Sequence, residues 1–324
     1  MKALLKSCMA LALLVGAGAG HAQTKWDLAS GYPINNPHTI TLNEFASDVD
    51  KTTGGKLMIT VHPGGSLLKV PEIKRGVQSG QVQVGEVLMS VLENENALYG
   101  IDSVPFLATS FDSSYELWQA QRPAVEKLLA GQGVKLLYAV AWPPQGIFSK
   151  KPINSTDDFK GLKWRSYNAT TQRIAQEYGA QPVTIQASEL AQALATGGIE
   201  AFMTSSATGV DAKVWESVSL FYTVDAWLPK NMVIMNQKEF DKLDKSTQQT
   251  VLKAAKEVES KGWKRMRDYT QQALSVLKQN KINVAAPSDK LRAGLDKFGE
   301  QSLADWLVKV GDDGKAVLGA YKKK

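Results

Sequence analysis

The sequence contains a single cysteine, Cys8, and only three histidines among 324 residues. Cys8 lies in an N-terminal segment with the features of a secretory signal, so we expect the mature chain to lack disulfides, thiol chemistry and cysteine metal sites. His38 and His62 follow that segment, each alone near proline or glycine, without a visible partner at metal-ligand spacing. The scarcity of both residue types argues against a disulfide scaffold and against a histidine or cysteine metal centre.

Long apolar runs are absent after the first 22 residues. Residues 1–22 combine the basic Lys2 and Lys6 with an apolar stretch over 9–15 and small residues up to Ala22. This pattern is typical of a secretory signal peptide cleaved after Ala22, and its apolar stretch is too short to span a bilayer. We therefore expect a soluble mature chain in the bacterial periplasm.

A strong charge of one sign is also missing. The formal net charge of +6 falls to +4 once Lys2 and Lys6 leave with the signal segment. The remaining lysines are scattered along predicted helices and lack the interleaved aromatics of a nucleic-acid surface. This distribution predicts a solvated surface and no nucleic-acid partner.

Recognisable catalytic motifs are missing too. The sequence has no GxSxG elbow, no HExxH helix, no Walker A loop and no GxGxxG turn after a strand. An enzyme is therefore not predicted. A periplasmic enzyme that anchors a carboxylic acid through an arginine is kept as the alternative, because such a site needs no local motif.

What the sequence does contain is a repeated alternation of strand and helix patterns, which is typical of α/β proteins. The alternation covers 38–55, 56–65, 70–80, 82–90, 113–133 and 134–142, and then 161–166, 169–180, 182–185, 188–198 and 199–205. A helical apolar stripe over 237–280 is longer than an ordinary globular helix. We expect two α/β lobes, each a mainly parallel sheet flanked by helices, with a long C-terminal helix crossing both.

Arg165 ends a predicted strand in the stretch "LKWRSYN", residues 162–168. A helix is predicted to begin close behind it, near Asn168. The free backbone amides at the start of that helix, together with the guanidinium, would favour a bound anion. The alternative is that Arg165 makes a surface salt bridge with Asp157 or Asp158.

Three stretches in this order, "GLKWRSYN", "YGAQPVTIQASELAQALATGGIEAF" and "LPKNMVIMN", resemble the solute-binding proteins of TRAP (tripartite ATP-independent periplasmic) transporters. The resemblance extends over essentially the whole mature chain and includes "HPGGSL" and "VPF". Its most specific element is GLKxR. In that family the arginine forms a salt bridge with the carboxylate of an organic acid enclosed between two lobes, so the resemblance makes Arg165 the carboxylate clamp.

The resemblance also implies an architecture and partners. It implies the two-lobe periplasmic-binding-protein fold, with 23–142 and about 231–270 in lobe 1, and 143–230 and about 271–324 in lobe 2. The loaded receptor would dock on TRAP membrane subunits, as a monomer and not as an enzyme. A receptor that feeds a sensor protein instead would have the same pocket.

Departures from the sialic-acid and dicarboxylate members bear on the ligand. Gln145 aligns where those members often carry a second arginine, Thr204 aligns with an asparagine, and Ala187 aligns with a phenylalanine of some relatives. One positive charge fewer argues against a second ligand carboxylate, and the small Ala187 leaves room for a ring. We therefore predict an organic monocarboxylate, with an aromatic or apolar 2-oxo or 2-hydroxy acid as the expected type.

Further candidates come from strand ends and loops, where ligands bind in open α/β sheets. Gln145 with Asp225 would suit a cation that bridges ligand and protein, and Asp225 could instead brace the hinge. The aromatic candidates could equally fill the core. The remaining predicted ligand-binding residues are Tyr32, Leu88, Met89, Trp142, Asn168, Phe202 and Trp227.

Overall fold

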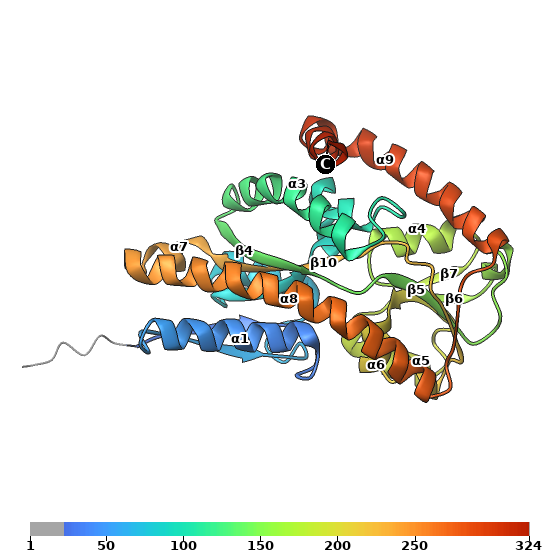
Figure 1. The fold of residues 1–324 in the computed structure, drawn as a ribbon, viewed down its shortest axis with the longest axis horizontal. Helices are drawn as coiled ribbons and strands as arrows, with labels where there is room; N and C mark the ends of the chain where they lie inside the picture. Colours follow the sequence, from blue (N-terminus) through green and yellow to red (C-terminus); the bar gives the residue numbers. More distant parts are fainter. Residues whose placement is uncertain (1–22, 324) are drawn as a thin grey trace, which may run out of the picture.

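The computed structural model describes residues 23–323. The predicted signal peptide, with Cys8, lies outside the described residues. Within 23–323 no helix is both long and apolar enough to cross a membrane. The chain forms two sheets with helices around them (Figure 1).

The first sheet has the strand order β2-β1-β3-β10-β4. β1 runs parallel to β2 and β3, whereas β10 runs antiparallel to β3 and β4. All seven residues of β10 are buried, as expected for a central strand covered on both faces. The bounds are β1 (Thr24–Ala29), β2 (Leu57–His62), β3 (Val84–Leu88), β4 (Val134–Ala141) and β10 (Lys230–Asn236).

The second sheet has the order β11-β9-β5-β8-β6-β7. β6 runs parallel to β7 and β8, and β5 runs antiparallel to β8 and β9. The two sheets confirm the predicted pair of α/β lobes. Each sheet is mixed and not purely parallel, because the strand that enters it from the other lobe, β10 or β5, runs antiparallel to both of its neighbours. The bounds are β5 (Gln145–Ser149), β6 (Lys163–Ser166), β7 (Gln181–Thr184), β8 (Ala201–Ser205), β9 (Leu220–Tyr222) and β11 (Asn283–Ala285).

Side-chain caps fix where the flanking helices begin. Asn36 accepts a hydrogen bond from the backbone amide of His38 at the start of α1, and Asn168 does the same for Thr171 in α4. The bounds are α1 (Pro37–Thr52), α2 (Ile73–Ser79), α3 (Phe111–Ala130), α4 (Ala169–Glu177), α5 (Leu190–Ala195), α6 (Ser206–Asp211) and α7 (Gln237–Asp241). Short 3₁₀ helices are η1 (Val70–Glu72), η2 (Met89–Leu92), η3 (Ala97–Ser103), η4 (Thr156–Phe159), η5 (Ala187–Glu189) and η6 (Val214–Glu216).

Two long helices connect the lobes. α8 (Lys245–Gln279) packs on α1 and β4 of the first lobe and on α6 and β11 of the second, and runs across both lobes in Figure 1. It confirms the predicted long C-terminal helix. The sequence pattern did not predict α9 (Asp289–Lys322), whose two arms meet at Gly311 with φ 68°, a value that glycine adopts without strain.

The chain also passes between the sheets at residues 142–144 and 223–229. These two crossing segments are hydrogen-bonded to each other. The Trp142 amide donates to the Pro229 carbonyl at 2.8 Å, and the Gln145 amide donates to the Trp227 carbonyl at 2.9 Å. The crossing segments therefore form one short ribbon at the boundary of the lobes.

Candidate functional site

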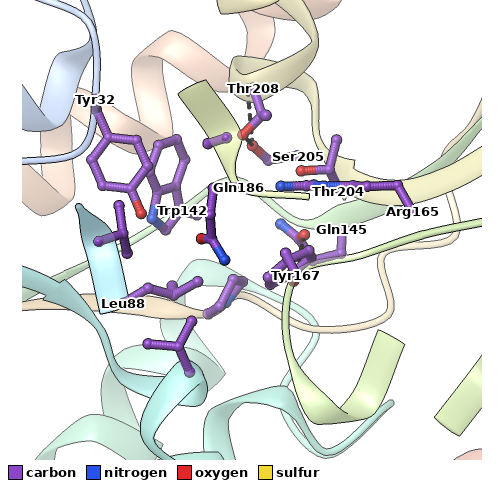
Figure 2. Close-up of a pocket in the computed structure, with 14 residues that line it drawn as sticks. Tyr32, Leu88, Trp142, Gln145, Arg165, Tyr167, Gln186, Thr204, Ser205 and Thr208 are labelled. Carbon is purple, nitrogen blue, oxygen red and sulfur yellow. Dashed lines mark hydrogen bonds between the residues drawn. The ribbon is translucent and has the colours of Figure 1, made fainter. Parts of the chain in front are cut away.

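A narrow cavity of about 40 Å³ lies where the crossing segments meet the two lobes. In Figure 2 the rings of Tyr32 and Trp142 lie on one side of it, and Arg165 enters from β6 on the other. The fourteen lining residues are Tyr32, Val70, Leu88, Val91, Trp142, Gln145, Arg165, Tyr167, Gln186, Ala187, Thr204, Ser205, Thr208 and Pro229.

Arg165 is the only charged side chain among these lining residues. It is 2% exposed, its Nε donates to the Ile185 carbonyl at 2.9 Å, and its guanidinium lies 5.0 Å from the centre of the Tyr167 ring. Its Nη1 is buried without a hydrogen-bond partner among the described residues. A buried charge with a free donor is costly unless an anion joins it.

The alternative interpretation of Arg165, a surface salt bridge, is wrong. Asp157 pairs with Lys290 at 2.9 Å, and Asp158 accepts the backbone amides of Asn154 and Ser155. Burial lowers the pKa of Arg165 to about 10, which still leaves the guanidinium charged at neutral pH. The cavity therefore holds a cation that no described carboxylate neutralises.

Gln145 is held rigidly by its neighbours. Its Oε1 accepts from the Tyr167 hydroxyl at 2.9 Å, and its Nε2 donates to the Pro143 carbonyl at 3.1 Å. These bonds orient the amide. The polar wall beside Gln145 is therefore fixed before a ligand arrives.

Neutral hydroxyl groups line the second-lobe wall. Thr204 is the penultimate residue of β8, and the hydroxyl oxygens of Ser205 and Thr208 lie 3.1 Å apart at the start of α6. Gln186 projects into the cavity from the segment after β7 (Figure 2). This wall offers donors and acceptors without a second charge, which suits a ligand with neutral polar groups.

The structure brings seven of the twelve predicted ligand-binding residues into the lining: Tyr32, Leu88, Trp142, Gln145, Arg165, Ala187 and Thr204. Met89 follows Leu88, so its side chain points away from the cavity and is fully buried in η2. Phe202 lies two residues deeper along β8 than Thr204 and stacks on Phe148 at 5.2 Å. Both differ from the prediction because they fill the core.

Three further predicted residues also lie outside the lining. Asn168 caps α4 and donates to Ser90 of the first lobe at 3.1 Å. Trp227 is fully buried, and its carbonyl accepts from Gln145. Asp225 is exposed with φ 52°, as expected for an aspartate that shapes a turn. These residues brace the site and do not line it.

The predicted cation site at Gln145 and Asp225 is not assembled. Both polar atoms of the Gln145 amide are already bonded, and Asp225 does not line the cavity. In the described part of the chain no group of three or more histidine, cysteine and acidic side chains could hold a metal ion. The geometry therefore favours direct contact between Arg165 and an anion.

The prediction missed seven lining residues. Tyr167 shares the strand face of Arg165, Ser205 is the last residue of β8, and Gln186 and Thr208 follow the ends of β7 and β8. The rule that ligands bind at strand ends could have found these four. No local signal marked the other three, Val70, Val91 and Pro229.

Known solute-binding proteins share this fold. A Bordetella pertussis extracytoplasmic solute receptor binding pyroglutamic acid is 50% identical, with a TM-score of 0.91 over 93% of this chain and 100% of the receptor. A marine metagenome TRAP solute-binding protein specific for pyroglutamate is 42% identical, with a TM-score of 0.92 over 93% and 99%. A solute-binding protein of Albidiferax ferrireducens is 25% identical over 82% of this chain and 76% of its own length.

The family match spans both sheets. Residues 28–306 match the family described as bacterial extracellular solute-binding protein, family 7. This region includes the crossing segments, the cavity, all of α8 and about half of α9. The chain therefore belongs to the family 7 bacterial extracellular solute-binding proteins, the periplasmic receptors of TRAP transporters.

Proposed function

We propose that this receptor captures pyroglutamate and delivers it to TRAP membrane subunits. The observation that carries the proposal is one buried, unpaired guanidinium in a small cavity that has no other charged lining residue. A monocarboxylate neutralises that charge, whereas a dicarboxylate would bring a second anion without a partner. An uncompensated buried charge is costly.

The size of the cavity supports a compact ligand. Its 40 Å³ corresponds to roughly three or four water-sized spheres side by side. Pyroglutamate is a five-membered lactam ring with one carboxylate, and its ring N–H and C=O need neutral partners. Gln186, Thr204 and Ser205 supply such groups. The relatives described as binding pyroglutamate share 50% and 42% of their residues with this chain.

An aromatic or apolar 2-oxo or 2-hydroxy acid stays a prediction from the sequence alone. Such an acid would satisfy Arg165 and fill the space beside Ala187. Its ring would leave the hydroxyl group of Thr204 without a partner, and a buried polar group that loses its partner costs about 1 to 3 kcal/mol. We therefore expect the lactam to bind more tightly.

A ligand panel tests this assignment. We expect pyroglutamate to raise the melting temperature most, ahead of benzoylformate, mandelate and succinate, and to be found by mass spectrometry in protein purified without added ligand. Pyroglutaminol, which lacks the carboxylate, and proline, which lacks the lactam carbonyl and carries a protonated ring amine, are the ligand controls. A panel led by succinate or benzoylformate would remove pyroglutamate as the ligand while leaving the receptor in its family.

The alternative, a periplasmic enzyme acting on an arginine-anchored acid, is not favoured. The described lining contains no carboxylate, histidine or cysteine that could act as base or nucleophile. Incubation of pyroglutamate with the protein, followed by mass spectrometry, is expected to return the acid unchanged.

We further propose that the lobes, divided after residues 142 and 230, rotate about the crossing segments. Three contacts join the lobes around the cavity: Asn36 to Asp211 at 2.6 Å, Asn168 to Ser90 at 3.1 Å and Arg173 to Glu93 at 3.2 Å. A ligand favours closure only through contacts made better in the closed form. These interlobe bonds and the contacts with the ligand would together stabilise the closed form.

Saturating pyroglutamate is therefore expected to reduce the radius of gyration in X-ray scattering, because closure brings the outer edges of the lobes together. At a hundredfold excess over Kd it should also stabilise the fold by about 2.7 kcal/mol. Succinate at the same concentration serves as the control. Superimposable scattering curves with and without bound pyroglutamate would rule out rotation of the lobes.

A further inference from the structure

A buried amide lies behind the aromatic wall of the cavity. Asn231, on β10, is 1% exposed and does not line the cavity. Its Oδ1 lies 2.9 Å from Trp142 Nε1 and 3.3 Å from the Tyr32 hydroxyl. One oxygen thus contacts the polar atoms of two of the three aromatic lining residues.

The chemistry of the donors fixes the orientation of this amide. The indole N–H of Trp142 can only donate, so an oxygen must face it. That orientation leaves the second lone pair of Oδ1 for the Tyr32 hydroxyl. The amide oxygen of Asn231 is therefore a shared acceptor for the two side chains.

The rings of Tyr32 and Trp142 meet at an angle, and their hydrogen bonds to Asn231 can hold that angle fixed. Their centres lie 4.8 Å apart, and their planes are inclined by 58°. Figure 2 shows them together on one side of the cavity. A flat ligand ring can contact both faces of this corner only while the angle is kept.

We propose that Asn231 is a positioning residue for ligand binding, which holds Tyr32 and Trp142 at a fixed angle through its shared amide oxygen. The proposal rests on the proposed function, in which a small ring lies against these side chains. It adds a determinant of affinity that never touches the ligand. The backbone supports this role, because Asn231 is paired in register with Leu88 of β3 and Val140 of β4.

The first test needs no ligand. The chain has eight tryptophans, and the Trp142 indole N–H resonance is assigned by its loss in Trp142→Phe. Asn231→Leu, which has a similar shape but no acceptor, is expected to move that resonance upfield and to speed its exchange with water. Asn231→Asp keeps an acceptor oxygen and is expected to retain slow exchange. An unchanged resonance in Asn231→Leu would overturn the proposal.

The second test is a double-mutant cycle with pyroglutamate. In the wild-type background Tyr32→Phe should weaken binding about three- to tenfold, because the free ring loses the hydrogen bond that holds it at the angle the ligand needs. In the Asn231→Leu background the same change should weaken binding by less than about twofold, because the hydroxyl no longer has its acceptor. Equal losses in both backgrounds would show that Tyr32 does not act through Asn231.

A matched control lies on the same strand. Asn236, at the far end of β10, is also buried and caps α7. Asn236→Ala should change stability but neither the Trp142 resonance nor the coupling with Tyr32. If pyroglutamate fails to bind the wild-type protein, the proposed ligand is wrong. The indole resonance still decides the role of Asn231, and the cycle is then run with the acid that mass spectrometry identifies.

Discussion

Arg165→Lys is expected to weaken pyroglutamate binding by about ten- to a hundredfold, although the positive charge is kept. A guanidinium presents a planar fork that matches a carboxylate, whereas an ammonium offers a single point. The loss of one charge-assisted hydrogen bond costs about 1.5 to 3 kcal/mol. Isothermal titration calorimetry measures the change directly.

The melting temperature of Arg165→Lys without ligand gives a second readout, which should not fall although the affinity does. Without ligand, the wild-type guanidinium is buried with a free Nη1, so its replacement should not lower the melting temperature. Arg75→Lys on α2 is the control, because Arg75 is exposed and does not line the cavity. An affinity for pyroglutamate that matches wild type would remove Arg165 from the binding site.

Glu259→Ala is expected to lower the free energy of unfolding by about 3 to 5 kcal/mol, the range for breaking a buried ion pair. Glu259 lies on α8 and is 6% exposed. Its Oε1 accepts from Trp118 Nε1 and from the Ala139 amide, both at 3.0 Å. Its Oε2 pairs with Arg122 at 2.9 Å. Alanine leaves all three donors without this acceptor.

Urea denaturation measures this effect, and the same helix supplies the control. Glu257 is two residues away, is half exposed and faces Lys253 at 3.9 Å. Such surface pairs contribute about 0 to 1 kcal/mol, so Glu257→Ala should change stability little. A loss below about 1 kcal/mol in Glu259→Ala would show that the Glu259 carboxylate does not hold α8 on the first lobe.

The elements that the sequence predicted well have strong periodicity or clear ends. The apolar stripe of α8 and the helical pattern over 38–55, which contains most of α1, are local patterns, and both are present in the structure. Strand direction is not a local pattern. The buried strand β10 has no alternation to reveal that it runs antiparallel to β3 and β4. The break of α9 at Gly311 likewise interrupts the helical spacing of apolar residues, which would otherwise have indicated a long helix.

The site shows the same limit at the level of single residues. The resemblance to TRAP receptors supplied Arg165 and Thr204, and strand-end reasoning placed Leu88 beside them. The sequence did not show how far along a strand the cavity extends, so Phe202 was wrongly included. It also did not show which of two neighbouring side chains faces the cavity, so Met89 was wrongly included. Strand alternation could have excluded Met89 once Leu88 was chosen. No sequence rule predicts a partner such as Asn231, because its role arises only when β10 joins the first sheet.

The paired crossing segments have a mechanical consequence. Trp142, Gln145 and Pro229 lie on or beside the ribbon about which the lobes would turn, so rotation displaces them little. Atoms at the far edges of the lobes move in proportion to their distance from that axis. Under the proposed rotation, a small movement near the axis, where the solute binds, would produce a large displacement at the outer edges of the lobes. The receptor would then work as a lever, and the membrane subunits would detect the solute without touching it.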